Sequence, residues 1–290
     1  MKLALGTANF SSVYGINISR VKKKELNKIF NYCKKNKIIH LDTAVAYNNH
    51  DILNGFNLKK LKIITKLINL EKFKKKDIRK EIINTVETIL KNLNIKQIYG
   101  LLLHDIKPMY SSKSDVIFKT LLYLKKKKLI KKIGISCYQI KDLNLIKNYS
   151  FNIVQFPLNI FDQRLIDNKV LQTLKKKKIE IHIRSIFLQG LLLRNYKKIP
   201  KYFSKWKKEF LKLEYCSRKL KKSKFELCIN FIKQFNFINM IVVGVDTEKQ
   251  LDLINKKFKN KHSFRFDYKL FSQLDKKLIL PYLWKINEKK

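Results

Sequence analysis

Four polar residues of different chemistry follow short apolar segments in the first 104 positions of the chain. Asp42, Lys66 and His104 each end one such segment, and Tyr47 lies five residues after Asp42. In a parallel barrel, side chains at the carboxyl ends of neighbouring strands converge on one pocket. We therefore expect these four groups to lie together.

Together, the four groups predict acid catalysis at a carbonyl oxygen. A tyrosine has a pKa of about 10, and a nearby ammonium such as Lys66 favours its phenolate. A carboxylate such as Asp42 keeps a buried ammonium charged. His104 is suited to orient the carbonyl or to assist the proton transfer, while a cofactor supplies hydride. Each residue alone has a structural alternative, as a cap, a surface lysine, a rim histidine or a packing tyrosine.

Strand-like and helix-like segments alternate along the whole chain and predict the elements that position these residues. The expected strands are Leu3–Thr7, Ile38–Thr43, Lys62–Lys66, Tyr99–His104, Ile133–Ser136, Ile153–Leu158, Ile179–Ser185 and Met240–Val245. The expected helices are Lys22–Lys37, Asp77–Leu93 with Asp77 as N-cap, Val116–Lys127, Ile140–Lys147, Leu165–Leu174, Phe225–Gln234 and Thr247–Phe258.

Eight such units predict an α/β fold, a single (β/α)8 TIM barrel formed by one domain over residues 1–290. An open doubly wound sheet is the alternative, but the chain has neither G-x-G-x-x-G nor a Walker loop. We expect residues 191–223 to form a long loop and an extra helix that shape or cover the site.

The formal net charge is +43, and 58 of the 65 basic residues are lysine. Specific nucleic-acid recognition usually enlists arginine, so we interpret the lysine runs mainly as solvated helix faces. Cys33, Cys137, Cys216 and Cys228 form no C-x-x-C pair, and no metal site is expected. Without an 18-residue apolar run or a signal peptide, we expect a cytoplasmic protein that does not enter membranes.

With these motifs in view, the chain resembles the aldo-keto reductase family over essentially its whole length. Leu5–Phe10 is similar to that family's first strand and loop, and Leu41–Tyr47 to its Asp-Thr-Ala…Tyr signature. Lys66 and His104 fall where its other catalytic residues belong. The resemblance implies that Asp42, Tyr47, Lys66 and His104 are catalytic.

The predicted cofactor contacts lie at the ends of the strands and in the loops that follow them. They are Gly6, Thr7, Asp42, Ser136, Gln155, Arg184, Ser185, Phe187, Leu188, Gly190, Gly244, Val245, Thr247 and Gln250. By the resemblance, Ser136 and Gln155 hold the nicotinamide carboxamide. Residues 185–191 could offer N–H groups to a pyrophosphate, and the helix that Thr247 opens favours an adenosine phosphate.

Several positions depart from the family pattern. Arg184 stands where an aromatic residue usually stacks on the nicotinamide, so it could stack as a planar cation or bind an acidic substrate group. Cys137 replaces an Asn, and the Asn expected at Ile254 comes one place late, at Asn255. Asp246 stands where a cation often binds the 2′-phosphate. The resemblance favours NADP(H), and Asp246 keeps NAD(H) open.

The predicted function is NAD(P)H-dependent reduction of an aldehyde, ketone or sugar carbonyl, or the reverse oxidation, without metal. The segment Arg184–Leu191 resembles a bacterial branch of the family often associated with surface-polysaccharide or sugar modification, so a sugar derivative is among the expected substrates. We expect a monomer or small homo-oligomer without a specific nucleic-acid partner. The alternatives are a cofactor-binding redox sensor or scaffold with little turnover and, with less support, a basic nucleic-acid-binding protein.

Overall fold

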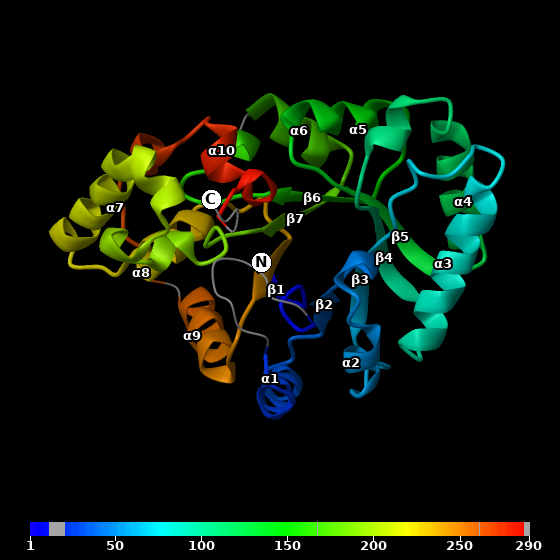
Figure 1. Cartoon of the computed structure of the whole chain (residues 1–290), viewed down its shortest axis with the longest axis horizontal. Coiled ribbons are helices and arrows are strands. Elements are labelled where there is room, and N and C mark those ends of the chain that lie inside the picture. Colours follow the sequence, from blue (N-terminus) through cyan, green and yellow to red (C-terminus); the bar gives the residue numbers. More distant parts are fainter. Residues whose placement is uncertain (12–20, 167, 261, 287–290) are drawn as a thin grey trace.

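The structure, a computed structural model, describes residues 1–11, 21–166, 168–260 and 262–286. Eight parallel strands close into a barrel in which each strand pairs with its neighbours in chain order and β8 pairs with β1. The strands run through the centre of the molecule (Figure 1). They are β1 (Lys2–Gly6), β2 (His40–Asp42), β3 (Lys62–Lys66), β4 (Ile98–Leu103), β5 (Ile130–Ser136), β6 (Ile153–Pro157), β7 (Glu180–Arg184) and β8 (Met240–Gly244). The predicted (β/α)8 barrel is confirmed.

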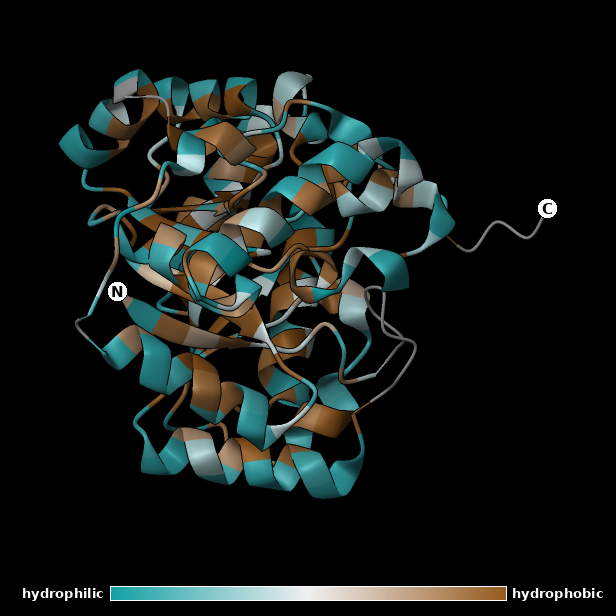
Figure 2. Cartoon of the chain, turned by 90° about the vertical axis from the view of Figure 1, so that its left-hand side faces the viewer, coloured by the Kyte–Doolittle hydropathy of each residue, from teal (hydrophilic) through white to brown (hydrophobic). Residues whose placement is uncertain are grey.

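The helices surround this barrel, with α3 and α4 on one side and α7 and α8 on the other (Figure 1). They are α1 (Lys23–Lys35), α2 (His50–Asn54), α3 (Ile78–Asn92), α4 (Ser114–Lys126), α5 (Leu145–Asn148), α6 (Asn168–Lys176), α7 (Lys207–Lys219), α8 (Lys224–Lys233), α9 (Glu248–Lys259) and α10 (Lys276–Ile279). In α1, Leu26, Ile29 and Cys33 recur at helical spacing and are buried. Hydrophilic residues cover much of the outer helix surface (Figure 2). No helix in the described ranges is both long and apolar enough to cross a membrane.

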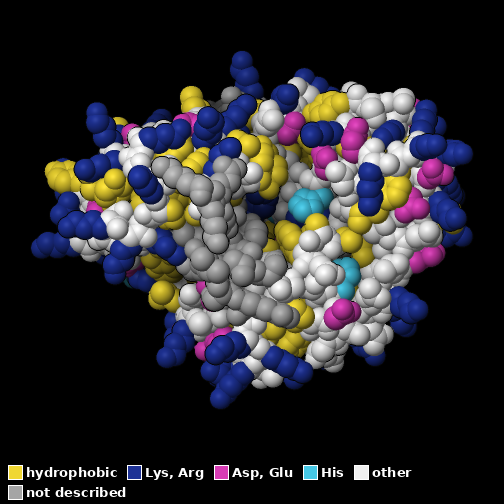
Figure 3. Space-filling model, viewed as in Figure 1, with side chains coloured by type: hydrophobic (Ala, Val, Ile, Leu, Met, Phe, Trp, Pro, Cys, Tyr) yellow, Lys and Arg dark blue, Asp and Glu magenta, His cyan; other side chains and the backbone are white. Residues whose placement is uncertain are grey.

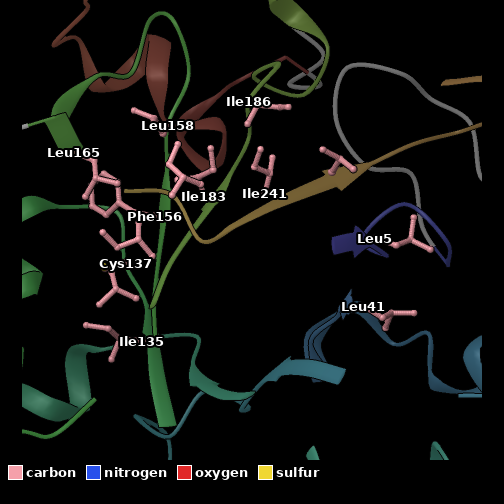
Figure 4. Close-up of a cluster of buried hydrophobic side chains, with 14 of the residues drawn as sticks. Leu5, Leu41, Ile135, Cys137, Phe156, Leu158, Leu165, Ile183, Ile186 and Ile241 are labelled. Carbon is pink, nitrogen blue, oxygen red and sulfur yellow. The ribbon is translucent and has the colours of Figure 1, made fainter. Parts of the chain in front are cut away.

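Apolar side chains fill two regions of the core. The larger cluster includes residues of the strands and of the helices around them, and part of it is drawn in Figure 4, including Leu5, Leu41 and Ile241. A smaller cluster forms a second group of buried strand residues, Ala4, Ile64, Leu102, Ile153, Met240 and Val242. This packing fixes the strands, and therefore fixes the polar residues at their carboxyl ends.

The structure differs from the expected elements in several places. The segment expected as one helix over Leu165–Leu174 is a 3-10 turn, Arg164–Ile166, followed by α6. Strand β5 begins at Ile130, three residues earlier than predicted. Asp77 is the N-cap residue of α3, as predicted, although its side chain makes no cap hydrogen bond. The segment expected as one helix over Ile140–Lys147 is a 3-10 turn, Ile140–Asn144, followed by the single turn α5.

The expected insertion after β7 consists of three 3-10 turns followed by α7. The insertion packs against the C-terminal segment, because the Trp206 indole donates to Asp275 Oδ2 at 3.1 Å. Phe203 also meets the Trp284 ring edge to face, with centroids 4.9 Å apart. The C-terminal segment in turn crosses to the loop after β6, where Gln273 N donates to the Phe161 carbonyl at 2.8 Å. These contacts bring the end of the chain to the rim of the barrel.

Candidate active site

The structure brings the four predicted catalytic residues together at the carboxyl ends of β2, β3 and β4. Lys66 Nζ lies 2.6 Å from Asp42 Oδ1, and both side chains are almost completely buried. Lys66 Nζ also lies 5.4 Å from the centroid of the Tyr47 ring. The Tyr47 and His104 rings meet edge to face with centroids 6.2 Å apart. Tyr47 is supplied by a 3-10 turn, Val45–Tyr47, and His104 directly follows β4.

Further hydrogen bonds satisfy both members of the buried ion pair. Lys66 Nζ donates to the Thr43 carbonyl at 3.0 Å, and Gln155 Nε2 donates to Asp42 Oδ2 at 2.7 Å. A buried ion pair is tolerated when its remaining donors and acceptors are satisfied in this way. Asp42 is therefore held by β3 and β6 together.

The backbone around Asp42 is fixed by a second polar network. Thr7 donates to the Asp42 carbonyl, and the Asn49 amide donates to both the Thr7 carbonyl and its hydroxyl, at 2.9 and 3.0 Å. Thr43 donates to Asn49 Oδ1 at 3.0 Å. All four residues are buried. Thr7, a predicted cofactor contact, thus holds the backbone of Asp42, a predicted catalytic residue.

Tyr47 differs from the expectation that Lys66 would lower its pKa. Burial raises the pKa of Tyr47 and the Asp42 carboxylate raises it further, whereas the Arg184 guanidinium opposes that shift. The Lys66 ammonium is paired with Asp42, and this carboxylate offsets part of the effect of the ammonium on the phenol. Tyr47 is therefore a neutral phenol across the ordinary pH range.

His104 is neutral as well. Burial lowers the pKa of His104 to about 4, and the positive charges of Lys66 and Arg184 lower it in the same direction. A neutral imidazole can donate one hydrogen bond from a ring N–H without adding charge to the site. The arrangement thus presents a phenol and a neutral imidazole above a buried ion pair.

Two buried oxygen atoms suit a bound nicotinamide cofactor. Among the described residues, Gln155 Oε1 and Asn9 Oδ1 have no hydrogen-bond partner. Gln155 aligns with the buried Ser136 across β5 and β6, as a pair that holds a carboxamide requires. Asn9 Oδ1 lies near the end of β8, 3.9 Å from the position that a Cβ on Gly244 would take. Both oxygens can accept from a ligand.

The predicted phosphate segment after β7 has an unusual backbone. Ser185, Leu188, Gln189 and Gly190 all have positive φ, between 48° and 83°. Three of these residues carry a Cβ, which makes the left-handed conformation unfavourable. Strained backbone of this kind is often found where a protein binds a ligand. Leu188 is fully buried and Phe187 stacks on Phe225, so the side chains anchor the segment and ligand contacts would come from the backbone.

The end of β8 supplies the remaining predicted contacts. Thr247 is the N-cap of α9 and accepts from Gln250 N, so the predicted helix start is confirmed. The Asn9 amide holds both the Val245 carbonyl and Asp246 Oδ1, at 2.9 and 2.8 Å. Gln250 Oε1 accepts from Asp246 N, which ties this side chain to the same turn.

Three further positions that the sequence singled out make packing contacts or hydrogen bonds within the fold. Gly6 allows β1 and β8 to approach, because a Cβ there would lie 3.1 Å from Val242 Cγ1. Asn255 is buried and donates to the Tyr32 hydroxyl of α1 at 2.9 Å, which ties α9 to α1. Burial raises the pKa of the Cys137 thiol, as expected for an inert cysteine. No cluster of three or more potential metal ligands occurs within the described ranges.

The sequence interpretation missed Tyr138 and Tyr282 at the site rim. Arg184 Cζ lies 4.2 Å from the centroid of the Tyr138 ring, which meets Tyr282 edge to face at 4.8 Å. Tyr138 directly follows Cys137 and could have been proposed from its place after β5. Tyr282 belongs to the C-terminal segment, and no local pattern connects it with the barrel.

Basic side chains are numerous on the surface of the molecule, as the net charge of +43 requires. Figure 3 shows lysine and arginine side chains spread around the periphery of this face and a hollow near its centre with a histidine beside it. Such a field increases the encounter rate with anionic ligands.

Comparison with known proteins places this geometry in context. The model of the aldo/keto reductase family matches residues 2–279. No curated protein matches the chain. An aldo-keto reductase from Bacillus halodurans in its holo form has 17% identity and a TM-score of 0.71, covering 93% of this chain and 90% of its own. A glycerol dehydrogenase from Gluconobacter oxydans has 19% identity and a TM-score of 0.70, covering 92% and 89%. These structures share the fold.

Proposed function

This chain belongs to the aldo/keto reductase family, and from that premise we propose that it reduces an aldehyde, ketone or sugar carbonyl with NAD(P)H. The observation that carries the proposal is the buried Asp42–Lys66 pair, at 2.6 Å, with Tyr47 and His104 beside it. The proposed catalytic residues are these four.

Each of these residues has a distinct part in the proposed reaction. When bound, the nicotinamide supplies the hydride that is added to the carbonyl carbon. Tyr47 donates its proton to the carbonyl oxygen, which becomes the alcohol hydroxyl. The Lys66 ammonium then stabilises the phenolate charge left on Tyr47, and solvent returns the proton.

Asp42 and His104 act on position and charge. Asp42 keeps Lys66 charged and fixed beside the Tyr47 ring. His104 is neutral at ordinary pH and can donate a hydrogen bond to the carbonyl oxygen, which aligns that oxygen with the phenol. Burial of the ion pair excludes water from it and strengthens its electrostatic effect.

The proposed cofactor contacts use buried acceptors and strained backbone. Gln155 Oε1 and Ser136 suit the carboxamide, and residues 185–190 with the start of α9 suit the phosphates. Asp246 would repel a 2′-phosphate, while the exposed Lys249 lies in the same turn. Both NADPH and NADH therefore belong in the assay, and Asp246→Ser should raise the preference for NADPH.

The test is loss of near-ultraviolet NAD(P)H absorbance with a panel of aldehydes, ketones and sugars. Tyr47→Phe should lower kcat by about 10²–10⁴-fold, because it removes the proton donor. Tyr215→Phe, on the exposed face of α7, is the matched control and should leave kcat unchanged. Absence of cofactor binding by fluorescence quenching would refute the proposal. Cofactor binding without turnover, unaffected by Tyr47→Phe, would favour a redox sensor or scaffold.

A further inference from the structure

Arg184 is a charged residue at the rim of the proposed site, at the end of β7. Its guanidinium carbon lies 4.2 Å from the centroid of the Tyr138 ring, and Nη2 lies 3.5 Å from the Cys137 carbonyl. The side chain is half-buried. Its guanidinium plane therefore packs against the wall formed by the loop after β5.

The ring that holds Arg184 is itself anchored. Arg164 Nη1 donates to the Tyr138 carbonyl at 2.7 Å, and Tyr282 packs edge to face on the Tyr138 ring. Arg164 is fixed in turn by two 2.7 Å hydrogen bonds to the fully buried Asp162. Three separated parts of the chain thus orient one guanidinium, and little side-chain entropy is left to lose when it binds a ligand.

The positive charge of Arg184 reaches the proposed reacting groups. The charge of Arg184 lowers the pKa of both Tyr47 and His104, which places the guanidinium close to these two groups. An anion bound at Arg184 would lie in a field that also covers the carbonyl position.

From this placement we infer that the substrate is a carbonyl compound that also carries an anionic group, and that Arg184 binds this group. The inference rests on the proposed function and assigns Arg184 to the substrate, which is one of the two roles that the sequence left open, the other being a cofactor contact. A planar guanidinium binds carboxylate and phosphate in two-pronged geometry. A carboxylate or phosphate a few bonds from the carbonyl would hold the reacting carbon near Tyr47.

Matched pairs of substrates test this inference on the full-length holoenzyme. Succinic semialdehyde is compared with butanal, and glyceraldehyde 3-phosphate with glyceraldehyde, so the two pairs distinguish a carboxylate from a phosphate. We expect kcat/KM to be at least about tenfold higher for the anionic member of one pair, mainly through KM. Arg184→Leu should abolish this difference, because it should slow the anionic member far more than the neutral one, and Arg184→Lys should retain part of the difference.

A matched control separates a local site from the general basic field. Arg79 on α3 also stacks on a tyrosine, with Cζ 4.6 Å from the Tyr123 ring centroid, and it is exposed. Arg79→Leu removes the same charge from the same kind of contact, and it should leave both substrate pairs unchanged. Equal loss in the two Arg→Leu variants would overturn the inference.

Two further measurements distinguish failure of the inference from failure of the proposed function. If Arg184→Leu weakens cofactor binding by fluorescence quenching and slows both members of each pair equally, Arg184 holds the cofactor and the inference is wrong. Calorimetric binding of succinate and inorganic phosphate to the holoenzyme needs no turnover. Binding of either anion that is lost in Arg184→Leu and kept in Arg79→Leu supports the anion site even if no carbonyl is reduced; absence of such binding opposes it.

Discussion

At the level of single residues, the site depends on a buried ion pair in which each charge stabilises the other. Asp42 holds Lys66 at 2.6 Å, and both are almost fully buried. Removing one charge leaves the other desolvated and unpaired, which typically costs about 3–5 kcal/mol. This cost is separate from any effect on catalysis, so stability and activity report on the pair independently.

We expect Asp42→Asn to lower the free energy of unfolding by about 3 kcal/mol, measured by urea denaturation at pH 7. The double variant Asp42→Asn/Lys66→Met should lose less than the sum of the two single variants, because it buries no charge. The exposed Lys28 on α1, which pairs with Glu25, provides the control, and Lys28→Met should cost well under about 1 kcal/mol. Additive losses at Asp42 and Lys66 would contradict the coupling.

The pH dependence follows from the two neutral groups at the site. With its pKa at about 4, His104 stays neutral above pH 5.5, and the raised pKa of Tyr47 keeps the phenol protonated. We expect kcat/KM for reduction to stay level from pH 5.5 to 8, and the rate of alcohol oxidation to rise with pH, because oxidation needs the phenolate. A reductive profile that falls with a midpoint near 6.5, and whose fall disappears in His104→Gln, would show that His104 titrates normally.

At the level of elements, one glycine lets two strands approach where the site is anchored. A Cβ on Gly134 of β5 would lie 2.7 Å from the Ile153 carbonyl and 2.8 Å from Ile153 Cβ. Real Cβ atoms are not found at such distances, and both neighbours belong to β6, which cannot move alone. Because β6 also carries Gln155, a shift of β6 would reach Asp42.

Gly134→Ala should therefore lower the free energy of unfolding by about 1–3 kcal/mol, measured by urea denaturation, and should also reduce turnover. Gly55→Ala is the control, since its Cβ would meet only the Ile52 carbonyl at 3.3 Å in ordinary helical backbone. A Gly134 variant as stable as the wild type would mean that β6 can shift to make room for the added Cβ at little cost in free energy.

At the level of the whole molecule, the sequence pattern predicts the strands and helices and the residues at strand ends. It does not predict contacts between segments that lie far apart in the chain. Eight apolar runs spaced by amphipathic helices predict the barrel, and the ends of those runs predict that Asp42, Lys66 and His104 meet. The placement of Tyr282 depends on the C-terminal segment crossing to Tyr138, which no periodic pattern encodes. The sequence also predicted a lowered pKa for Tyr47, whereas the structure raises it. The reason is that burial of the phenol and the pairing of Lys66 with Asp42 arise only in the folded state.

The opposite end of the barrel holds a polar network that ties several strands together. Glu180 on β7 accepts from Lys132 Nζ at 2.5 Å, from the Tyr99 hydroxyl at 3.2 Å and contacts His182 Nε2 at 3.2 Å. Although burial opposes it, hydrogen bonds from His182 and Lys132 lower the pKa of Glu180 to about 2. The buried His40 packs on the Tyr99 ring. Burial, with the charges of Lys62 and Lys2, lowers the pKa of His40 to about 4.

These groups should make the whole fold sensitive to acid. His40 and His104, whose pKa values are about 4 in the fold and 6.5 when unfolded, bind fewer protons in the fold across that window, so stability falls as the pH falls. Each histidine should cost about 2 kcal/mol between pH 7 and pH 5 by urea denaturation. Glu180 adds a further loss between about pH 4.5 and pH 2, as its stabilising charge is titrated. His40→Leu should remove its own share, about 2 kcal/mol, from the loss between pH 7 and 5, and the exposed His262→Asn should leave the loss unchanged. A stability that stays constant between pH 7 and pH 5 would mean that both histidines can be protonated within the fold, through local opening that admits water to the barrel.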